Sequence, residues 1–128
     1  MPNDLISEEL LDAIAMVESH NNPRAVGDKA LKQKAYGAYQ MRQPALDDVR
    51  QRHKQYANTR LEDILGDAKT QRELARLYLN VLANDYGLST FEKAVMGYNA
   101  GPTAIQRGEV TPKALRYLGK VKGQMRPR

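Results

Sequence analysis

The chain of 128 residues contains no cysteine, which excludes disulfides, cysteine-rich zinc sites and thiol catalysis. It also lacks a long apolar run, so the sequence predicts no membrane-spanning helix. Acidic residues stand near the start, where a secretory signal carries Lys or Arg and then an apolar core, and we therefore expect no signal peptide. Because His20 and His53 show no metal-ligand spacing, neither a metal site nor a cofactor is expected.

Negative charge is in the minority, since 15 Asp and Glu residues oppose 20 Lys and Arg residues and leave a net charge of +5. Such a charge suits nucleic acid, an anionic membrane surface or a polyanionic wall polymer, and it does not choose among them. The length fits one domain. We assign residues 1–121 to that domain and interpret the basic stretch 122–128 as a solvated tail.

Apolar residues recur at helical spacing along nearly the whole chain, which predicts a single compact, mainly α domain of about seven short helices. Segment 24–41 is predicted as a loop, with at most a short strand near YGAYQM. The expected helices run from about Asn3 or Ser7 to His20, from Pro44 to His53, through TRLED, from Asp67 to Tyr86, from Ser89 to Asn99, and onward from Pro102 and from Pro112. Ser7 is the expected cap of the first helix, and capping boxes are predicted for Thr59 with Glu62 and for Ser89 with Glu92.

Glu18 lies four residues after Ile14 and seven after Leu11, and therefore on or beside the apolar face of the first helix. An apolar setting and the negative end of the helix dipole both favour the protonated acid. A carboxyl group that stays protonated near neutral pH is suited to general acid catalysis. The alternative is a glutamate at the edge of the apolar face, with its carboxylate in water or paired with a cation.

Two other segments carry residues suited to binding sugars. YGAYQM places Gln40 in a predicted tight loop, and GYNAGP places Tyr98 and Asn99 at a helix end. An aromatic ring stacks on a pyranose face, and an amide bonds hydroxyl or acetamido groups. Each segment also has an ordinary interpretation, as a surface loop and as a helix stop with Gly101 and Pro102.

Together and in this order, the segments resemble the SLT-type lytic transglycosylases and their relatives, the goose-type lysozymes. The family motif Glu-Ser followed by Asn-Pro-x-Ala corresponds to residues 18–25. Ala-x-Gly-Leu-Met-Gln corresponds to 35–40, with Pro44 nearby, and Ala-Tyr-Asn-Ala-Gly-Pro corresponds to 97–102. A later Tyr before a Val corresponds to Tyr117 and Val121, so the resemblance spans residues 10–121.

This resemblance implies a lysozyme-like α fold and cleavage of peptidoglycan glycan strands between N-acetylmuramic acid and N-acetylglucosamine. It implies Glu18 as both acid and base, and a glycan groove lined by Ser19, Gln40, Tyr98, Asn99 and Tyr117. The chain departs from the family pattern where Ala38 and Tyr39 replace Leu-Met, where Gly97 replaces Ala, and where Arg42 occupies a usually apolar position.

A single carboxylate suffices for a lytic reaction, in which the sugar's own 6-hydroxyl attacks and a 1,6-anhydro end forms. An inverting hydrolase needs a second carboxylate to activate water. Asp28 is the first candidate for that role, before Asp47 and Asp48, because goose-type lysozymes also carry Gly-Asp in the loop after the glutamate. A third hypothesis is a non-catalytic basic module that binds DNA or forms part of a virion, although no recognisable DNA-binding motif is present.

The resemblance places the action at the bacterial cell wall. Because no export signal is expected, we predict delivery by a phage virion, by phage lysis as an endolysin, or as part of a longer protein. A secretion-system accessory protein with a removed leader is a further possibility. We expect a monomer that binds glycan strands and no specific nucleic acid.

Overall fold

The computed structural model describes residues 6–125 and is mainly helical. The α-helices of this part are α1 (Glu8–Ser19), α2 (Gln43–Arg52), α3 (Ala68–Asn84), α4 (Phe91–Ala100), α5 (Pro102–Gln106) and α6 (Pro112–Met125). Two 3-10 helices, η2 (Lys54–Tyr56) and η3 (Leu61–Ile64), connect α2 to α3. The predicted mainly α, lysozyme-like fold class with a minor β element is confirmed.

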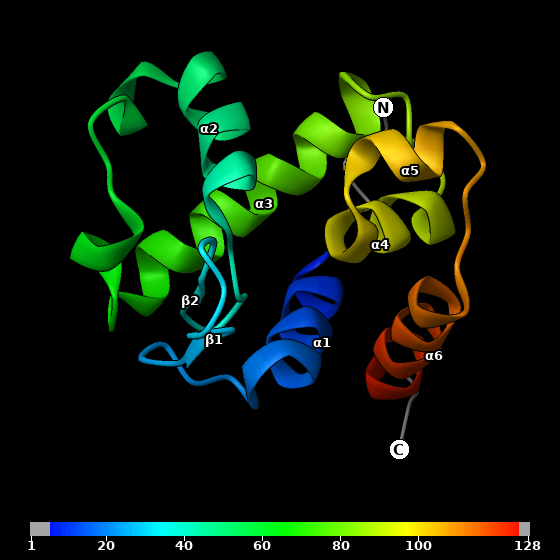
Figure 1. The fold of residues 1–128 in the computed structure, drawn as a ribbon, viewed down its shortest axis with the longest axis horizontal. Coiled ribbons are helices and arrows are strands. Elements are labelled where there is room, and N and C mark those ends of the chain that lie inside the picture. Colours follow the sequence, from blue (N-terminus) through cyan, green and yellow to red (C-terminus); the bar gives the residue numbers. More distant parts are fainter. Residues whose placement is uncertain (1–5, 126–128) are drawn as a thin grey trace.

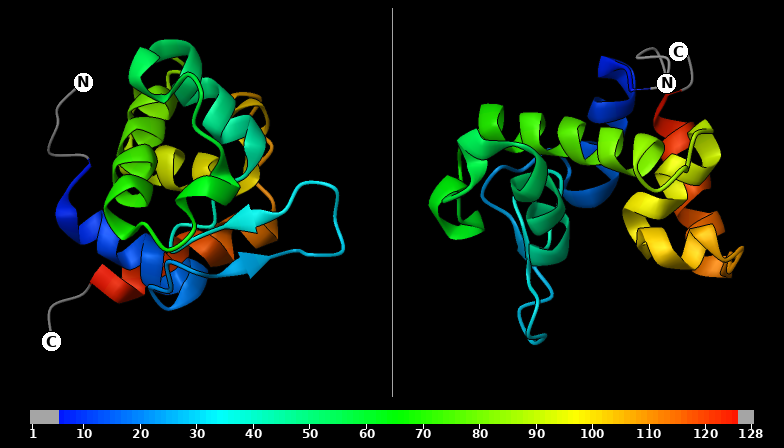
Figure 2. Two further views of the ribbon diagram at one scale, coloured as in Figure 1. Left: turned by 90° about the vertical axis from the view of Figure 1, so that its left-hand side faces the viewer. Right: turned by 90° about the horizontal axis from the view of Figure 1, so that it is seen from above.

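The β element consists of β1 (Val26–Gly27) and β2 (Ala35–Tyr36), which pair antiparallel with Val26 opposite Tyr36. The loop between the two strands projects from the body of the molecule (Figure 2). Tyr36 also forms a bridge with Met41, so the chain folds back on itself directly after β2. This turn lies next to the end of α1 (Figure 1) and brings two of the segments singled out in the sequence close together.

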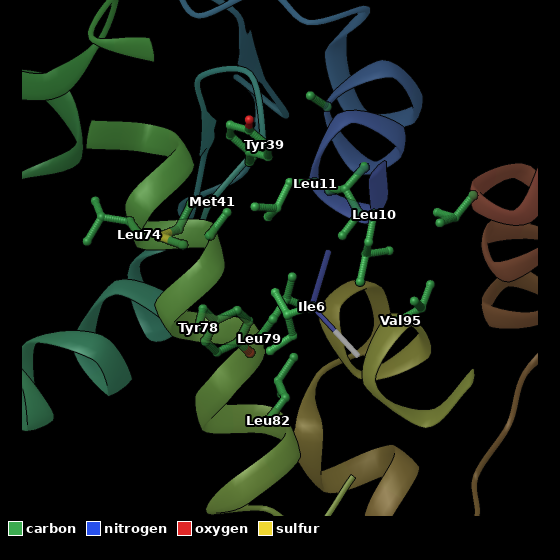
Figure 3. Close-up of a cluster of buried hydrophobic side chains, with 14 of the residues drawn as sticks. Ile6, Leu10, Leu11, Tyr39, Met41, Leu74, Tyr78, Leu79, Leu82 and Val95 are labelled. Atoms are coloured by element: carbon green, nitrogen blue, oxygen red, sulfur yellow. The ribbon is translucent and has the colours of Figure 1, made fainter. Parts of the chain in front are cut away.

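Helix α1 contributes to the core and is flanked by α3 on one side and α6 on the other (Figure 1). Its side chains Leu10, Leu11 and Ile14 are fully buried, as the helical spacing predicts. They pack among apolar residues of α3 and α4, including Leu79 and Val95 (Figure 3). Burial of about 1.5–3 kcal/mol per large apolar side chain makes this core the main source of stability and gives the end of α1 a fixed position.

Of the three predicted helix caps, one is confirmed and two are wrong. Ser7 caps α1 by accepting a hydrogen bond from the Leu10 N–H, whereas Asn3, the alternative start, lies outside the described residues. The prediction of a capping box at Thr59 is wrong, because the 3-10 helix that forms there begins after Arg60 and has no side-chain cap. The cap of α4 is Thr90 rather than Ser89, since the Thr90 hydroxyl accepts the bond from the N–H of the third helical residue.

The final helix, α6, extends to Met125 and therefore into the stretch interpreted as a tail. Lys122 in that stretch forms an ion pair with Glu92 of α4 at 3.4 Å. The division into residues 1–121 and 122–128 stays a prediction, and 126–128 lie outside the described residues. Within residues 6–125, no helix combines the length and the apolar character needed to cross a membrane.

Candidate active site

Glu18 lies in the last turn of α1, where the helix meets α6. Its carboxyl group is half-buried, and the hydroxyl of Tyr117 in α6 donates a hydrogen bond to its Oε2 at 2.9 Å. Tyr117 is itself buried, with 7% of its surface exposed. The hydrogen bond and the buried ring hold the carboxyl group in one orientation, although the two residues are 99 positions apart in the chain.

Burial raises the pKa of Glu18 from its ordinary value of 4.5 to about 7. The hydrogen bond from Tyr117 and the charges of Arg42 and Lys113 lower the pKa, and the charge of Asp28 raises it, but burial dominates. The carboxyl group is therefore about half protonated near neutral pH. In this state it can either donate or accept a proton, as an acid–base catalyst must.

A cleft of about 290 Å³ opens in front of Glu18. One wall comes from the chain between β1 and the start of α2, and the other from the end of α4 and the residues that follow it. The residues that line the cleft are Glu18, Asp28, Ala35, Gln40, Met41, Arg42, Pro44, Ala45, Tyr78, Tyr98, Asn99, Ala100, Gly101, Pro102 and Lys113. Sugar units fit such a surface, because it combines aromatic and amide groups with one carboxyl group of raised pKa.

The chain leaves α1 through two consecutive residues in the left-handed conformation, His20 and Asn21, with φ of 57° and 60°. His and Asn are among the non-glycine residues that adopt this conformation most readily. Ser19 stabilises the turn, because its hydroxyl donates to the Ala38 carbonyl at 2.7 Å and accepts from the Asn22 N–H at 2.9 Å. Ser19, one of the predicted groove residues, thus ties the end of α1 to the turn after β2.

The turn after β2 is also held by Gln71, a residue of α3 that the sequence analysis did not single out. Only 6% of Gln71 is exposed. Its Oε1 accepts from the Ala38 N–H at 2.9 Å, and its Nε2 donates to the carbonyls of Pro23 and Ile64, each at 2.8 Å. The Gln71 amide therefore connects the segment after α1, the turn after β2 and the end of η3.

Gly37 is required where this amide approaches the turn. Its φ of 81° lies in the region that favours glycine, and a Cβ at this position would come within 2.5 Å of the Gln71 amide carbon. The glycine of the predicted motif is thus explained by the buried amide behind it.

Gln40 lies on the cleft wall, where sequence analysis predicted a sugar contact. Its Nε2 donates to the Gly37 carbonyl at 2.9 Å and to the Ala25 carbonyl at 3.4 Å. The backbone of Gln40 is in the strained left-handed region, with a φ of 49°. Its Oε1 lies against Gly27, where a Cβ would come within 2.2 Å. These contacts fix the Gln40 side chain across the base of the strand pair, so its predicted contact with a sugar would be made by a rigid group.

Tyr98 and Asn99 form the opposite wall at the end of α4. The Tyr98 hydroxyl donates to the Tyr39 carbonyl at 2.7 Å, and its ring lies 5.7 Å from the Tyr78 ring. Tyr98 therefore connects the two walls of the cleft. The structure explains why Tyr39 differs from the methionine of the family motif. Its side chain is buried, and its hydroxyl accepts a hydrogen bond from the Arg72 guanidinium at 2.9 Å.

Asp28 and Arg42, also cleft residues, form an ion pair with each other. Arg42 donates in addition to the Gln33 carbonyl at 2.6 Å, so its guanidinium spans the base of the projecting loop. Both side chains are more than two-fifths exposed, at 44% and 41%. Asp28, the predicted second catalytic carboxylate, is therefore already paired with the guanidinium of Arg42.

Most of the side chains that the sequence predicts for the site line this one cleft, namely Glu18, Asp28, Gln40, Tyr98 and Asn99. The Ser19 hydroxyl instead bonds to backbone, and Tyr117 bonds to Glu18 without lining the cleft. Within residues 6–125, no group of three or more His, Asp or Glu side chains is arranged to hold a metal ion. Gln71 was missed, although it lies three and seven residues before the apolar Leu74 and Tyr78. A polar residue on an apolar face is the same signal that drew attention to Glu18.

A comparison with protein families matches one model, described as the transglycosylase SLT domain, to residues 3–117. The matched range includes Glu18, both walls of the cleft and Tyr117. No curated protein and no solved structure matches the chain.

Proposed function

Because the chain belongs to the transglycosylase SLT domain family, whose members act on peptidoglycan, we propose that it is a lytic transglycosylase. It cleaves the β-1,4 bond between N-acetylmuramic acid and N-acetylglucosamine and leaves 1,6-anhydromuramic acid ends. The observation that carries this proposal is the half-buried Glu18 carboxyl, with a pKa of about 7, at the junction of the cleft walls.

In the first step, the protonated Glu18 donates its proton to the glycosidic oxygen as the bond to the anomeric carbon breaks. The acetamido group of the substrate stabilises the developing positive charge, as in substrate-assisted glycosidases. The Tyr117 hydroxyl, which donates to Glu18, stabilises the carboxylate that results.

In the second step, the Glu18 carboxylate accepts the proton of the 6-hydroxyl of the same sugar. The 6-oxygen then attacks the anomeric carbon, and the anhydro bridge forms. Attack within one sugar gains from effective molarity, so no second carboxylate has to position water. Glu18 ends protonated and is ready for the next cycle.

The wall residues bind the glycan in this proposal. Tyr98 offers a ring to a sugar face, and Asn99 and Gln40 offer amides to hydroxyl and acetamido groups. Ser19 acts indirectly, since its hydroxyl holds the Ala38 carbonyl and with it the turn that carries Gln40.

The rival reaction is hydrolysis with Asp28 as the group that activates water. Asp28 supports this rival by its place in the cleft. The ion pair with Arg42 supports the lytic reaction instead, because a carboxylate that is already paired with a guanidinium must give up that partner before it can orient a water molecule.

Replacing Glu18 by Gln tests the assignment. General acid–base catalysis contributes about 10²–10⁴-fold, so the Glu18→Gln protein should lose at least about a hundredfold in peptidoglycan cleavage. Glu9→Gln is the matched control, since it removes a carboxylate from an exposed position of the same helix. A folded Glu18→Gln protein with wild-type turnover would contradict the assignment.

Product analysis separates the two reactions. Mass spectrometry of digested sacculi should show 1,6-anhydromuramic acid ends, whereas only reducing ends would establish hydrolysis. Asp28→Asn should retain most of the activity. A loss as large as that of Glu18→Gln would instead assign Asp28 to water activation.

Action on peptidoglycan places the protein at the bacterial cell wall. The routes predicted from the sequence, namely a phage virion, phage lysis or a longer protein, remain proposals. The genes that neighbour this one would distinguish among these routes.

A further inference from the structure

Glu18 stands at the meeting point of two clefts. The second has a volume of about 380 Å³ and lies between the end of α1 and the outer face of α6. It shares Glu18, Asn99 and Lys113 with the first cleft. A substrate bound in the first cleft can therefore extend a substituent into the second without leaving the neighbourhood of Glu18.

The second cleft has a strongly basic wall. Lys113, Arg116 and Lys120 are spaced three and four residues apart and so lie on one face of α6. All three are exposed, and none forms an ion pair with an acidic residue in the described range 6–125. Helix α6 itself contains no Asp or Glu.

The other face of α6 explains why the basic face is rigid. Ala114, Leu118 and Val121 are buried against the rest of the domain, and α6 packs on α1 and α4. The three cations are thus carried by an ordered helix beside the catalytic carboxyl group. The hydroxyl and acetamido groups of a glycan, which the first cleft binds, carry no charge. The three cations must therefore bind another, negatively charged part of the substrate.

We propose that the second cleft binds the carboxylates of the peptide stem that hangs from the muramic acid at the cleavage site. This inference rests on the proposed function and names the form of its substrate: glycan that still carries its peptides. The stem is attached through the lactyl group of the same sugar that is cleaved, so it leaves the first cleft close to Glu18. Its free carboxylates match the lysine and arginine side chains of α6.

The experiment compares two substrates, namely glycan strands that carry their stems and the same strands after an amidase has removed the stems and the lactyl carboxylates that it exposes have been converted to amides. The quantity measured is kcat/KM on each, and the ratio of the two values is compared between proteins. The test variant is Arg116→Gln with Lys120→Gln. Lys113 is left unchanged, because its charge lowers the pKa of Glu18 and its removal would alter the chemistry itself.

The matched control is Lys54→Gln with Lys69→Gln. Both lysines are exposed and line neither cleft, and the control loses the same charge. Wild type and control should prefer stem-bearing strands. In the test variant the ratio should fall roughly fivefold, because two exposed ion pairs are lost, each contributing a factor of a few.

A third substrate, stem-bearing strands whose carboxylates have been converted to amides, separates charge from bulk. The kcat/KM of wild type on these amidated strands should be close to its value on the stripped strands. An equal ratio in wild type and test variant, or full activity of wild type on amidated strands, would overturn the inference. A wild type that cleaves none of the three substrates would contradict the proposed function instead.

Discussion

At the scale of single residues, the raised pKa of Glu18 links catalysis to stability. Its pKa is about 7 in the folded protein and near 4.5 in an unfolded chain. Below pH 4.5 the group is protonated in both states and does not change the free energy of unfolding. As the pH rises through about 7, the folded state loses stability, because the unfolded chain releases this proton more easily.

Glu18→Gln should therefore stabilise the protein at alkaline pH. We expect a gain of about 2–4 kcal/mol at pH 8 and almost none at pH 4, since the two pKa values differ by about 2.5 and a difference of one corresponds to about 1.4 kcal/mol. Thermal or denaturant unfolding at the two pH values measures the difference. A gain of the same size at both would show that the effect comes from packing rather than from ionisation.

Tyr117 adjusts the same pKa in the opposite direction. Its hydroxyl donates to the carboxylate and so lowers the pKa that burial raises. Tyr117→Phe should raise the pKa of Glu18 further, and the alkaline limb of the pH–activity profile should move to higher pH.

The matched control for that change is Tyr86→Phe, which removes a tyrosine hydroxyl bonded to Asp48, away from the cleft. Its profile should match wild type. A Tyr117→Phe profile that keeps its shape while the rate falls would assign Tyr117 to packing alone.

At the scale of elements, the cleft depends on how α3 supports the turn after β2. Gln71→Ala leaves the Ala38 N–H and two carbonyls without their buried partner, and each unsatisfied group costs about 1–3 kcal/mol. We expect a loss of several kcal/mol in unfolding free energy, together with a lower kcat.

Gln51→Ala serves as the control for this change, because Gln51 is an exposed residue in the last turn of α2. It should leave both stability and kcat near wild type. An equally mild Gln71→Ala would show that water replaces the amide and that the turn does not need it.

The comparison of Glu18 with Gln71 shows how far the sequence predicts the site. Helix positions follow from apolar spacing. The same spacing singles out Glu18, but its catalytic role is predicted only through the motif that accompanies it. Gln71 carried the same signal without a motif, and its partner Ala38 is 33 residues away. The caps at Thr59 and Ser89 failed because neighbouring hydroxyl and backbone groups compete for the same N–H groups, and the fold decides which of them bonds.

At the scale of the whole molecule, the excess positive charge is unevenly distributed. Arg72 and Arg76 are paired with Glu8 on α1, and Arg52 with Asp48 and Asp85. The basic face of α6 has no such acidic partner within residues 6–125. Part of the excess positive charge therefore lies beside the cleft, on the face of α6 that carries Lys113, Arg116 and Lys120.

This distribution bears on the remaining hypothesis of a non-catalytic module that binds DNA. A single short basic face contacts few phosphates, so we expect only weak binding that is independent of sequence, with a Kd of roughly 10⁻⁴–10⁻⁶ M, and a steep loss with salt.

A gel shift series from low to physiological salt, with wild type and Glu18→Gln, tests that expectation. Both proteins should shift DNA at low salt, because the substitution leaves the three cations of α6 in place, and neither should do so at about 0.15 M salt. Anhydro ends should be formed by wild type alone. Tight binding at physiological salt, combined with no wall cleavage by wild type, would favour the DNA-binding module, since the same basic face would then serve phosphates instead of peptide carboxylates.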